Sequence, residues 1–219
     1  MSDFVLQERT LGQMLDETVA RFPDREALIY VGHDFRQTWS EFAATVDRLA
    51  RGLMALGIQP GEKIALWATN VPYWVCMMFA TARIGVTLVA VNTNYRDSEL
   101  EYLIRQSECE NFCCIDGFLD YDYVAALYRV IPGLEETKPG ELHCDKFPHL
   151  RRVMSLRNMP HPGILTMNDI LSRADGVSVE EYKAREAMVK PHDVVNMQYT
   201  SGTTGFPKGV MLSHVGIGN

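Results

Sequence analysis

Residues 63–115 read KIALWATNVPYWVCMMFATARIGVTLVAVNTNYRDSELEYLIRQSECENFCCI, and this stretch decides the fold. Apolar runs typical of buried strands alternate in it with helix-like segments. The strands are expected at 63–68, 87–91 and 111–115, and the helices at 72–84 and 98–106. Strands that are apolar on both faces and alternate with helices favour a parallel sheet covered on both sides. The sequence therefore predicts an α/β fold, with helices on both faces of the sheet and a βαβ core at 63–116.

The segment before this core predicts two helices and a hairpin. Apolar residues at helical spacing predict a helix over 10–22, and a strand over 27–31 is followed by a turn at Gly32. Thr38-Trp39-Ser40-Glu41 has the form of a capping box, so a second helix is expected to begin there and to end at Gly57.

Residues 117–192 are an irregular α/β region. A helix-like stretch that includes Tyr121 and Tyr128 runs into Pro132-Gly133. A strand at 151–155 and a helix at 179–189 are the other expected elements. The histidines and the cysteine here have no regular ligand spacing, so exposed loop residues are favoured over a metal site; they are His143, Cys144, His149 and His161.

Composition narrows the function classes. The chain has 219 residues, 47% of them hydrophobic and 22% charged, which excludes a disordered class. A net charge of −7 repels a polyanionic backbone, so no nucleic-acid partner is expected. No apolar run reaches the length of a transmembrane segment and the first residues lack a signal-peptide pattern, so a cytoplasmic location is expected. The five cysteines are interpreted as reduced core thiols, and the tryptophans and Met77-Met78-Phe79 as core residues.

Residues 193–214, DVVNMQYTSGTTGFPKGVMLSH, carry the chemistry. An apolar strand at 194–199 leads into a loop dense in hydroxyls and glycines, and a short apolar run at 210–212 follows. Glycines let the backbone turn its N–H groups toward an anion, hydroxyls donate hydrogen bonds, and a lysine supplies positive charge. The candidate cofactor-binding residues are Thr200, Ser201, Gly202, Thr203, Thr204, Gly205, Pro207, Lys208, Gly209 and His214.

A P-loop does not fit this segment. Counted from Gly202, the second glycine of G-x-x-x-x-G-K-[ST] falls on Pro207, and Gly209 stands where the magnesium-binding Ser or Thr belongs. A P-loop also opens directly into a helix, whereas 210–212 resembles a returning strand before Ser213 begins a helix. A glycine-rich surface turn without a ligand is the other alternative to an anion-binding loop, and the Pro-Lys-Gly ending makes it less favoured.

Tyr199-Thr-Ser-Gly-Thr-Thr-Gly-Phe-Pro-Lys-Gly-Val210 resembles the signature loop of the adenylate-forming superfamily. The similarity extends upstream through Thr38–Phe42, Leu56–Ala65, Asn70–Trp74, Val91–Tyr95 and Glu99–Tyr102, and it covers essentially the whole chain. The Val-Asn-x-x-Tyr and Glu-Leu-Glu-Tyr pieces are most similar to medium-chain fatty-acyl-CoA synthetases.

The resemblance implies a reaction of ATP with a carboxylic acid, expected to be a fatty acid, to give acyl-AMP and pyrophosphate, after which coenzyme A displaces AMP. It implies that the loop and Lys208 hold the β- and γ-phosphates with Mg²⁺ between phosphate oxygens. None of these residues is a nucleophile, so no catalytic residue and no protein metal ligand is assigned. His214 matches the histidine that closes the motif, with a packing role at a helix start as the alternative.

The resemblance also implies that 1–219 form an incomplete N-terminal part of the large domain, without the remainder of that domain and the mobile small domain. We therefore expect this chain alone to be inactive and to self-associate through exposed sheet surface. Two alternatives stay open: an aryl-CoA ligase or amino-acid adenylation domain, and a truncated, non-catalytic nucleotide-binding or interaction module.

Overall fold

The computed structural model describes residues 6–33, 35–200 and 207–219. Within them, the central sheet has seven strands in the order β11-β10-β4-β3-β5-β8-β9. Every neighbouring pair is parallel except β10 and β11, which are antiparallel. The strands are β3 (Lys63–Trp67), β4 (Thr87–Ala90), β5 (Asn111–Cys114), β8 (Arg152–Ser155), β9 (Ile164–Leu165), β10 (Val194–Thr200) and β11 (Lys208–Ser213).

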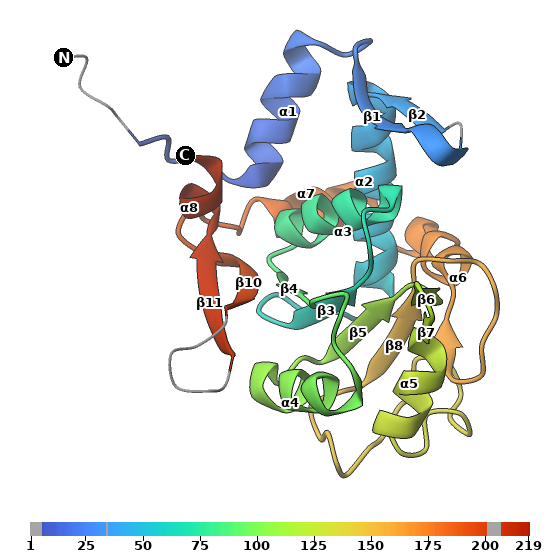
Figure 1. Cartoon of the computed structure of the whole chain (residues 1–219). Coiled ribbons are helices and arrows are strands. Elements are labelled where there is room, and N and C mark those ends of the chain that lie inside the picture. Colours follow the sequence, from blue (N-terminus) through green and yellow to red (C-terminus); the bar gives the residue numbers. More distant parts are fainter. Residues whose placement is uncertain (1–5, 34, 201–206) are drawn as a thin grey trace.

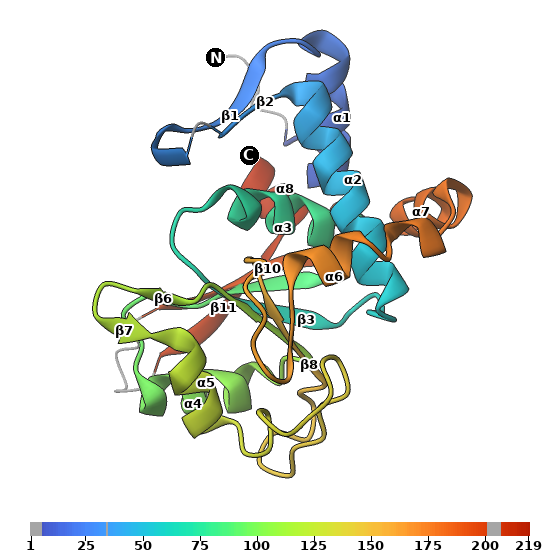
Figure 2. The same ribbon diagram turned by 90° about the vertical axis from the view of Figure 1, so that its right-hand side faces the viewer.

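Helices cover both faces of this sheet, as the sequence predicts (Figures 1 and 2). On one face lie α2 (Trp39–Ala55) and α3 (Pro72–Arg83), with α1 (Leu11–Arg21), α6 (Met167–Leu171) and α7 (Val179–Glu186) packed around them. On the other face lie α4 (Asp97–Ser107) and α5 (Tyr123–Val130). The short α8 (His214–Gly218) follows β11 and contacts α1.

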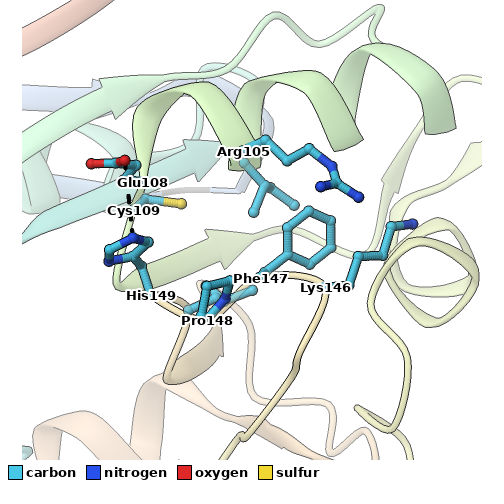
Figure 3. A pocket seen from close by; sticks show the side chains of 9 residues that line it. Arg105, Glu108, Cys109, Lys146, Phe147, Pro148 and His149 are labelled. Atoms are coloured by element: carbon cyan, nitrogen blue, oxygen red, sulfur yellow. Dashed lines mark ion pairs between the residues drawn. The ribbon is translucent and has the colours of Figure 1, made fainter.

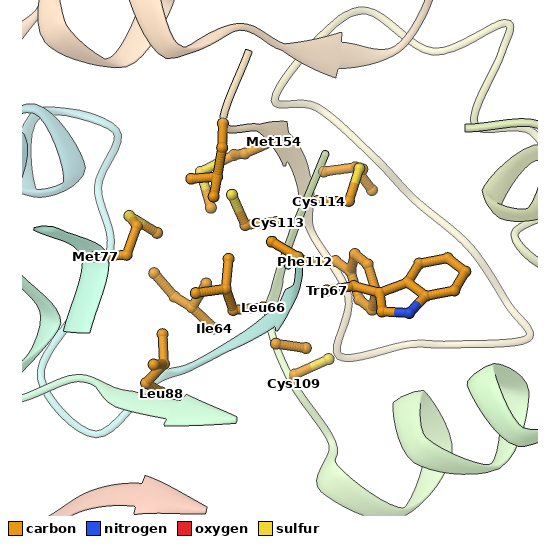
Figure 4. Close-up of a cluster of buried hydrophobic side chains, with 14 of the residues drawn as sticks. Ile64, Leu66, Trp67, Met77, Leu88, Cys109, Phe112, Cys113, Cys114 and Met154 are labelled. Atoms are coloured by element: carbon orange, nitrogen blue, oxygen red, sulfur yellow. The ribbon is translucent and has the colours of Figure 1, made fainter. Parts of the chain in front are cut away.

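The core lies between the central strands and these helices (Figure 4). Its largest fully buried side chain, Trp67, stacks on Tyr123 with ring centroids 3.6 Å apart. The indole N–H of Trp67 donates to the carbonyl oxygen of Asn92 at 3.1 Å, so this buried polar group is satisfied. Trp39 and Trp74 are half-buried against the same core, which confirms the interpretation of the tryptophans as core residues.

The N-terminal prediction is confirmed. β1 (Glu26–Tyr30) and β2 (Phe35–Thr38) pair antiparallel, with the 3₁₀ turn η1 (Val31–His33) between them. The hydroxyl of Thr38 accepts from the backbone N–H of Glu41, whose side chain accepts from the N–H of Thr38. This capping box fixes where α2 begins.

The irregular region differs from the sequence prediction in detail. Tyr121 belongs to the two-residue strand β7 (Tyr121–Asp122), which pairs with β6 (Gly117–Phe118). The helix α5 begins only at Tyr123, because Asp122 is its N-cap. The strand near 151–155 is confirmed as β8. Helix α7 ends at Glu186, three residues before the expected end, and the 3₁₀ turn η2 (Ala174–Gly176) precedes it.

All five cysteines are free and buried, which confirms them as core thiols. Burial raises the pKa of Cys76 to about 12 and that of Cys109 to about 11, so both thiols stay protonated at neutral pH.

Candidate functional site

The candidate site is at the loop end of the β10–β11 hairpin, where β10 ends and β11 begins. Thr200 pairs with Lys208 at that end, and Gln198 pairs with Ala90 of the parallel strand β4. Ala90 is the last residue of β4, and Thr200 lies two residues beyond its partner Gln198 on β10. Thr200 is therefore just past the carboxyl end of β4. In open α/β sheets, ligands bind outside the carboxyl ends of parallel strands. The fold thus places the loop end of the hairpin where such a sheet binds its ligand.

Several of the sequence-predicted residues can be placed in the structure. Thr200 and Lys208 are exposed, and Pro207 and Gly209 are half-buried. Ser201, Gly202, Thr203, Thr204 and Gly205 lie outside the described residues. The two ends of the loop therefore present one hydroxyl and one ammonium group to solvent, and both groups can bind phosphate oxygens.

The chain returns as a strand after the loop. β11 runs antiparallel to β10 over Lys208–Ser213, and only then does Ser213 cap α8 by accepting from the N–H of Gly216. A P-loop would continue directly into a helix at this point. The returning strand therefore favours an adenylate-forming loop, as the sequence analysis predicts.

Gly209 packs closely against two side chains of β10. A Cβ there would lie 3.0 Å from Sδ of Met197 and 3.4 Å from Cζ of Tyr199, and the backbone does not adopt a left-handed φ. The sequence analysis ascribed this glycine to backbone approach to an anion. The described structure shows a close approach by two side chains of β10, since Tyr199 is the cross-strand partner of Gly209, and the anion-binding role stays a prediction.

His214 lies at the other end of β11 from Lys208. With a rise of about 3.3 Å per residue, the two residues are about 20 Å apart. The ring is buried, and its Nδ1 accepts from the backbone N–H of Leu11 at 3.1 Å. Burial lowers the pKa of His214, although Asp193 opposes the shift, so the ring is neutral with the proton on Nε2. These contacts support the packing alternative, and its role in cofactor binding stays a prediction.

Polar residues also follow the central strands at the same edge of the sheet. Thr69 and Asn70 follow β3, and Asn92 and Thr93 follow β4. Thr69, Asn70 and Thr93 line a hollow of about 420 Å³ together with Phe118 and neighbouring residues. These residues are not among those predicted from the sequence to form a site. The signal that could have found them is a polar residue directly after each apolar strand.

A second hollow, of about 230 Å³, lies at the C-terminal end of α4 beside residues 146–150 (Figure 3). Arg105 and Lys146 border it, and both pair with Glu101, while His149 faces Glu108 at 4.0 Å. Its charges are therefore largely compensated within the protein. Across the described part of the chain, no group of three or more His, Cys, Asp or Glu side chains is placed to hold a metal ion.

Sequence comparison identifies the family. The family model described as "AMP-binding enzyme" matches residues 15–219. The chain belongs to the AMP-binding enzyme family. It is 39% identical over 210 residues to the protein of Bacillus subtilis named "Putative acyl-CoA synthetase YngI", covering 96% of this chain and 38% of that protein. It is 36% identical over 219 residues to the mitochondrial medium-chain acyl-CoA ligase ACSF2 of Mus musculus, covering 100% of this chain and 35% of that ligase.

Solved structures share the AMP-binding fold. The anthranilate CoA ligase AuaEII, solved with anthranoyl-AMP, matches with a TM-score of 0.74 at 21% identity, covering 98% of this chain and 36% of that one. The long-chain-fatty-acid-CoA ligase FadD1 of Archaeoglobus fulgidus gives a TM-score of 0.72 at 23% identity, covering 96% and 38%. The chain thus spans little more than a third of the length of these relatives. No helix among the described residues has the length and apolar character needed to cross a membrane.

Proposed function

We propose that this AMP-binding chain is the N-terminal part of an ATP-dependent acyl-CoA synthetase and supplies its loop for the ATP phosphates. The observation that carries the proposal is the strand–loop–strand unit at the carboxyl edge of the parallel sheet, with Thr200 and Lys208 exposed at its two ends. Family membership and the similarity to proteins named as acyl-CoA synthetases or ligases support it.

The proposed reaction has two steps. A carboxylate oxygen attacks the α-phosphorus of ATP, the bond to the bridging oxygen of pyrophosphate breaks, and acyl-AMP forms. The thiol of coenzyme A then attacks the acyl carbonyl carbon, its proton is lost, and AMP leaves with the electron pair of the broken C–O bond. The hydroxyl of Thr200 and the ammonium of Lys208 would hold the β- and γ-phosphates and offset the charge that develops on pyrophosphate.

Magnesium enters this proposal as part of the ATP·Mg²⁺ substrate. The described ends of the loop offer a hydroxyl and an ammonium group, a donor set that suits phosphate oxygens, whereas Mg²⁺ prefers carboxylates and water. We therefore assign no protein metal ligand, and Mg²⁺ would bridge phosphate oxygens. The proposed acid is a medium-chain fatty acid, supported by the name of ACSF2 at 36% identity.

Direct titration tests the phosphate-binding role. The chain is titrated with ATP·Mg²⁺ and, separately, with pyrophosphate by isothermal calorimetry, alongside Lys208→Ala and Gly205→Ala. We expect saturable binding that each substitution weakens about tenfold or more. Lys138→Ala is the matched control, because Lys138 is exposed and pairs with Glu141 away from the loop. Absence of binding in a folded chain, or equal binding by Lys208→Ala and Lys138→Ala, would contradict the proposal.

Two finer parts of the proposal have their own measurements. The acid class is tested by fatty-acid-dependent exchange of pyrophosphate into ATP in a protein that contains this chain at the relatives' full length, with medium-chain, long-chain and aromatic acids in parallel. Self-association is supported by the exposure of Val210 and Met211 on the outer strand β11, and sedimentation over a range of concentrations tests it. The cytoplasmic location stays a prediction.

A further inference from the structure

Helix α4 contacts the hairpin from one face of the sheet. Tyr102 and Gln106 are four residues apart on α4, so they lie on the same side of the helix. The hydroxyl of Tyr102 donates to the carbonyl oxygen of Pro207 at 3.0 Å. The hydroxyl of Tyr199 donates to Oε1 of Gln106. One face of α4 therefore forms hydrogen bonds with the chain on both sides of the loop, at Tyr199 and at Pro207.

The two contacts fall on opposite sides of the loop. Tyr199 is the penultimate residue of β10, and Pro207 directly precedes β11. We call Tyr199–Thr200 and Pro207–Lys208 the two stems of the loop. Since Tyr102 holds one stem and Gln106 the other, the spacing of these two helix residues is tied to the separation of the stems.

The returning stem is otherwise held by the pairing of β11 with β10. Among the described residues, β11 is an edge strand with β10 as its one strand neighbour, and Val210 and Met211 are 42% and 64% exposed. A strand end with few buried apolar contacts opens locally at a low free-energy cost. A hydrogen bond from α4 to Pro207 therefore contributes more to local order here than it would in the middle of the sheet.

The packing keeps the bond donors in place. Tyr102 and Tyr199 are half-buried, and burial raises the pKa of Tyr199, so its hydroxyl keeps its proton at neutral pH. The Tyr199 ring also occupies the space next to Gly209, which lacks a side chain to displace it. The Tyr199 ring thus lies against Gly209 on the side of the hairpin from which it reaches Gln106.

We propose that Tyr102 and Gln106 of α4 are positioning residues that hold the two stems in register and thereby set the placement of Thr200 and Lys208 toward an anion. The stem contacts stand by themselves, and only their consequence for phosphate binding rests on the proposed function. Neither residue is proposed to touch the substrate.

Amide hydrogen exchange measures the stem contacts independently of any ligand. Tyr102→Phe and Gln106→Leu should each raise exchange at the amides of Lys208–Val210 about five- to tenfold, the amount expected from loss of one hydrogen bond. Amides of the central strands should not change. Gln106→Glu keeps an acceptor oxygen for Tyr199, so it should restore slow exchange where Gln106→Leu does not.

Tyr128→Phe is the matched control. The Tyr128 hydroxyl donates to the carbonyl oxygen of Pro162 at 2.9 Å, the same kind of bond as that from Tyr102 to Pro207, but on α5. It should leave exchange in β11 unchanged. If Tyr102→Phe and Tyr128→Phe give the same exchange in β11, the stem contacts do not order the hairpin and the proposal is overturned.

Pyrophosphate titration of the same variants tests the functional consequence. We expect Tyr102→Phe to raise the dissociation constant by a factor similar to its effect on exchange, with no change for Tyr128→Phe. Raised exchange together with unchanged pyrophosphate affinity would overturn the positioning role. Failure of the unsubstituted chain to bind pyrophosphate, with the expected exchange pattern, would contradict the proposed function and leave the stem contacts established.

Discussion

The middle of the sheet and its β10–β11 edge are held by different interactions. In β3 every residue after Lys63 is buried, and β4 and β5 flank it on both sides. In β11, by contrast, Lys208, Val210 and Met211 are exposed, and within the described part of the chain only one side of the strand is paired. Apolar burial is non-directional and fixes the middle as a whole, whereas the edge depends on its backbone pairing with β10 and on a few side-chain hydrogen bonds from α4. The residues proposed to bind phosphate lie where the structure is least buried, which makes binding and global stability separable.

The largest effect should come from the centre. Trp67→Ala removes a fully buried indole from β3, its stack on Tyr123 and its bond to Asn92, and should lower the free energy of unfolding by about 3–5 kcal/mol. Urea unfolding followed by circular dichroism measures the change. Trp74→Ala, at a half-buried position on α3, should cost less. A loss below about 1 kcal/mol for Trp67→Ala would mean that the central layer does not dominate stability.

The next largest effect should come from the contact between α2 and α6, two helices that cover one face of the sheet. Ala is normally favoured over Gly within a helix, but a Cβ on Gly52 would lie 2.4 Å from the carbonyl oxygen of Ile170. Gly52→Ala should therefore destabilise the chain by about 1–3 kcal/mol, since α6 must move away from α2. Gly176→Ala meets no atom within 4 Å and is the control in thermal unfolding. Equal melting temperatures for the two variants would contradict the close packing of α2 and α6.

The far end of the hairpin should give a pH-dependent effect. Burial lowers the pKa of His214 in the folded chain, so the unfolded chain binds a proton more readily. Stability should be full above the unfolded-state value of 6.5 and should fall as the pH drops below it toward the lower folded-state pKa. His214→Asn keeps an acceptor for Leu11 without a titrating group and should flatten this dependence. His143→Asn, at an exposed position, should leave it intact when urea midpoints are compared between pH 5 and pH 8.

The smallest effect should come from the exposed face of the edge strand. Met211 is 64% exposed, so Met211→Ser should change the free energy of unfolding by no more than about 0.5 kcal/mol. Met77→Ser, at a fully buried position on α3, should cost several times more. If chains associate through β11, Met211→Ser should also shift sedimentation toward the monomer. A large loss of stability in Met211→Ser would show that this face is buried.

Local patterns were enough to predict much of the fold. The strands and helices of 63–115 follow from apolar runs of the right length, and Thr38-Trp39-Ser40-Glu41 indicates a helix start through its own side chains. The returning strand after Pro207 was likewise predicted from its apolar run. Such signals depend on neighbours within one or two turns of chain, and they survive in the folded structure because the tertiary contacts agree with them.

The rest depended on distant contacts. The early end of α7 at Glu186 and the hydrogen bond of His214 to Leu11 each depend on residues that no local pattern specifies in advance. The same holds for Arg83, a fully buried charge on α3 that pairs with Asp16 of α1 and Glu186 of α7. The sequence pattern shows where Arg83 lies along its own helix, but it does not show which other helices will supply the carboxylates that pair with it.

The sequence by itself determined the class of fold, the order of its central elements and the family resemblance of the loop, because hydrophobic period, capping residues and motif order are properties of the chain. Only the tertiary structure decided that Gly209 packs against Tyr199, that His214 packs against α1, and that one face of α4 reaches both stems of the loop. The contacts of His214 and of α4 require segments more than 90 residues apart to meet, and the meeting is set by the packing of the sheet and its helices as a whole.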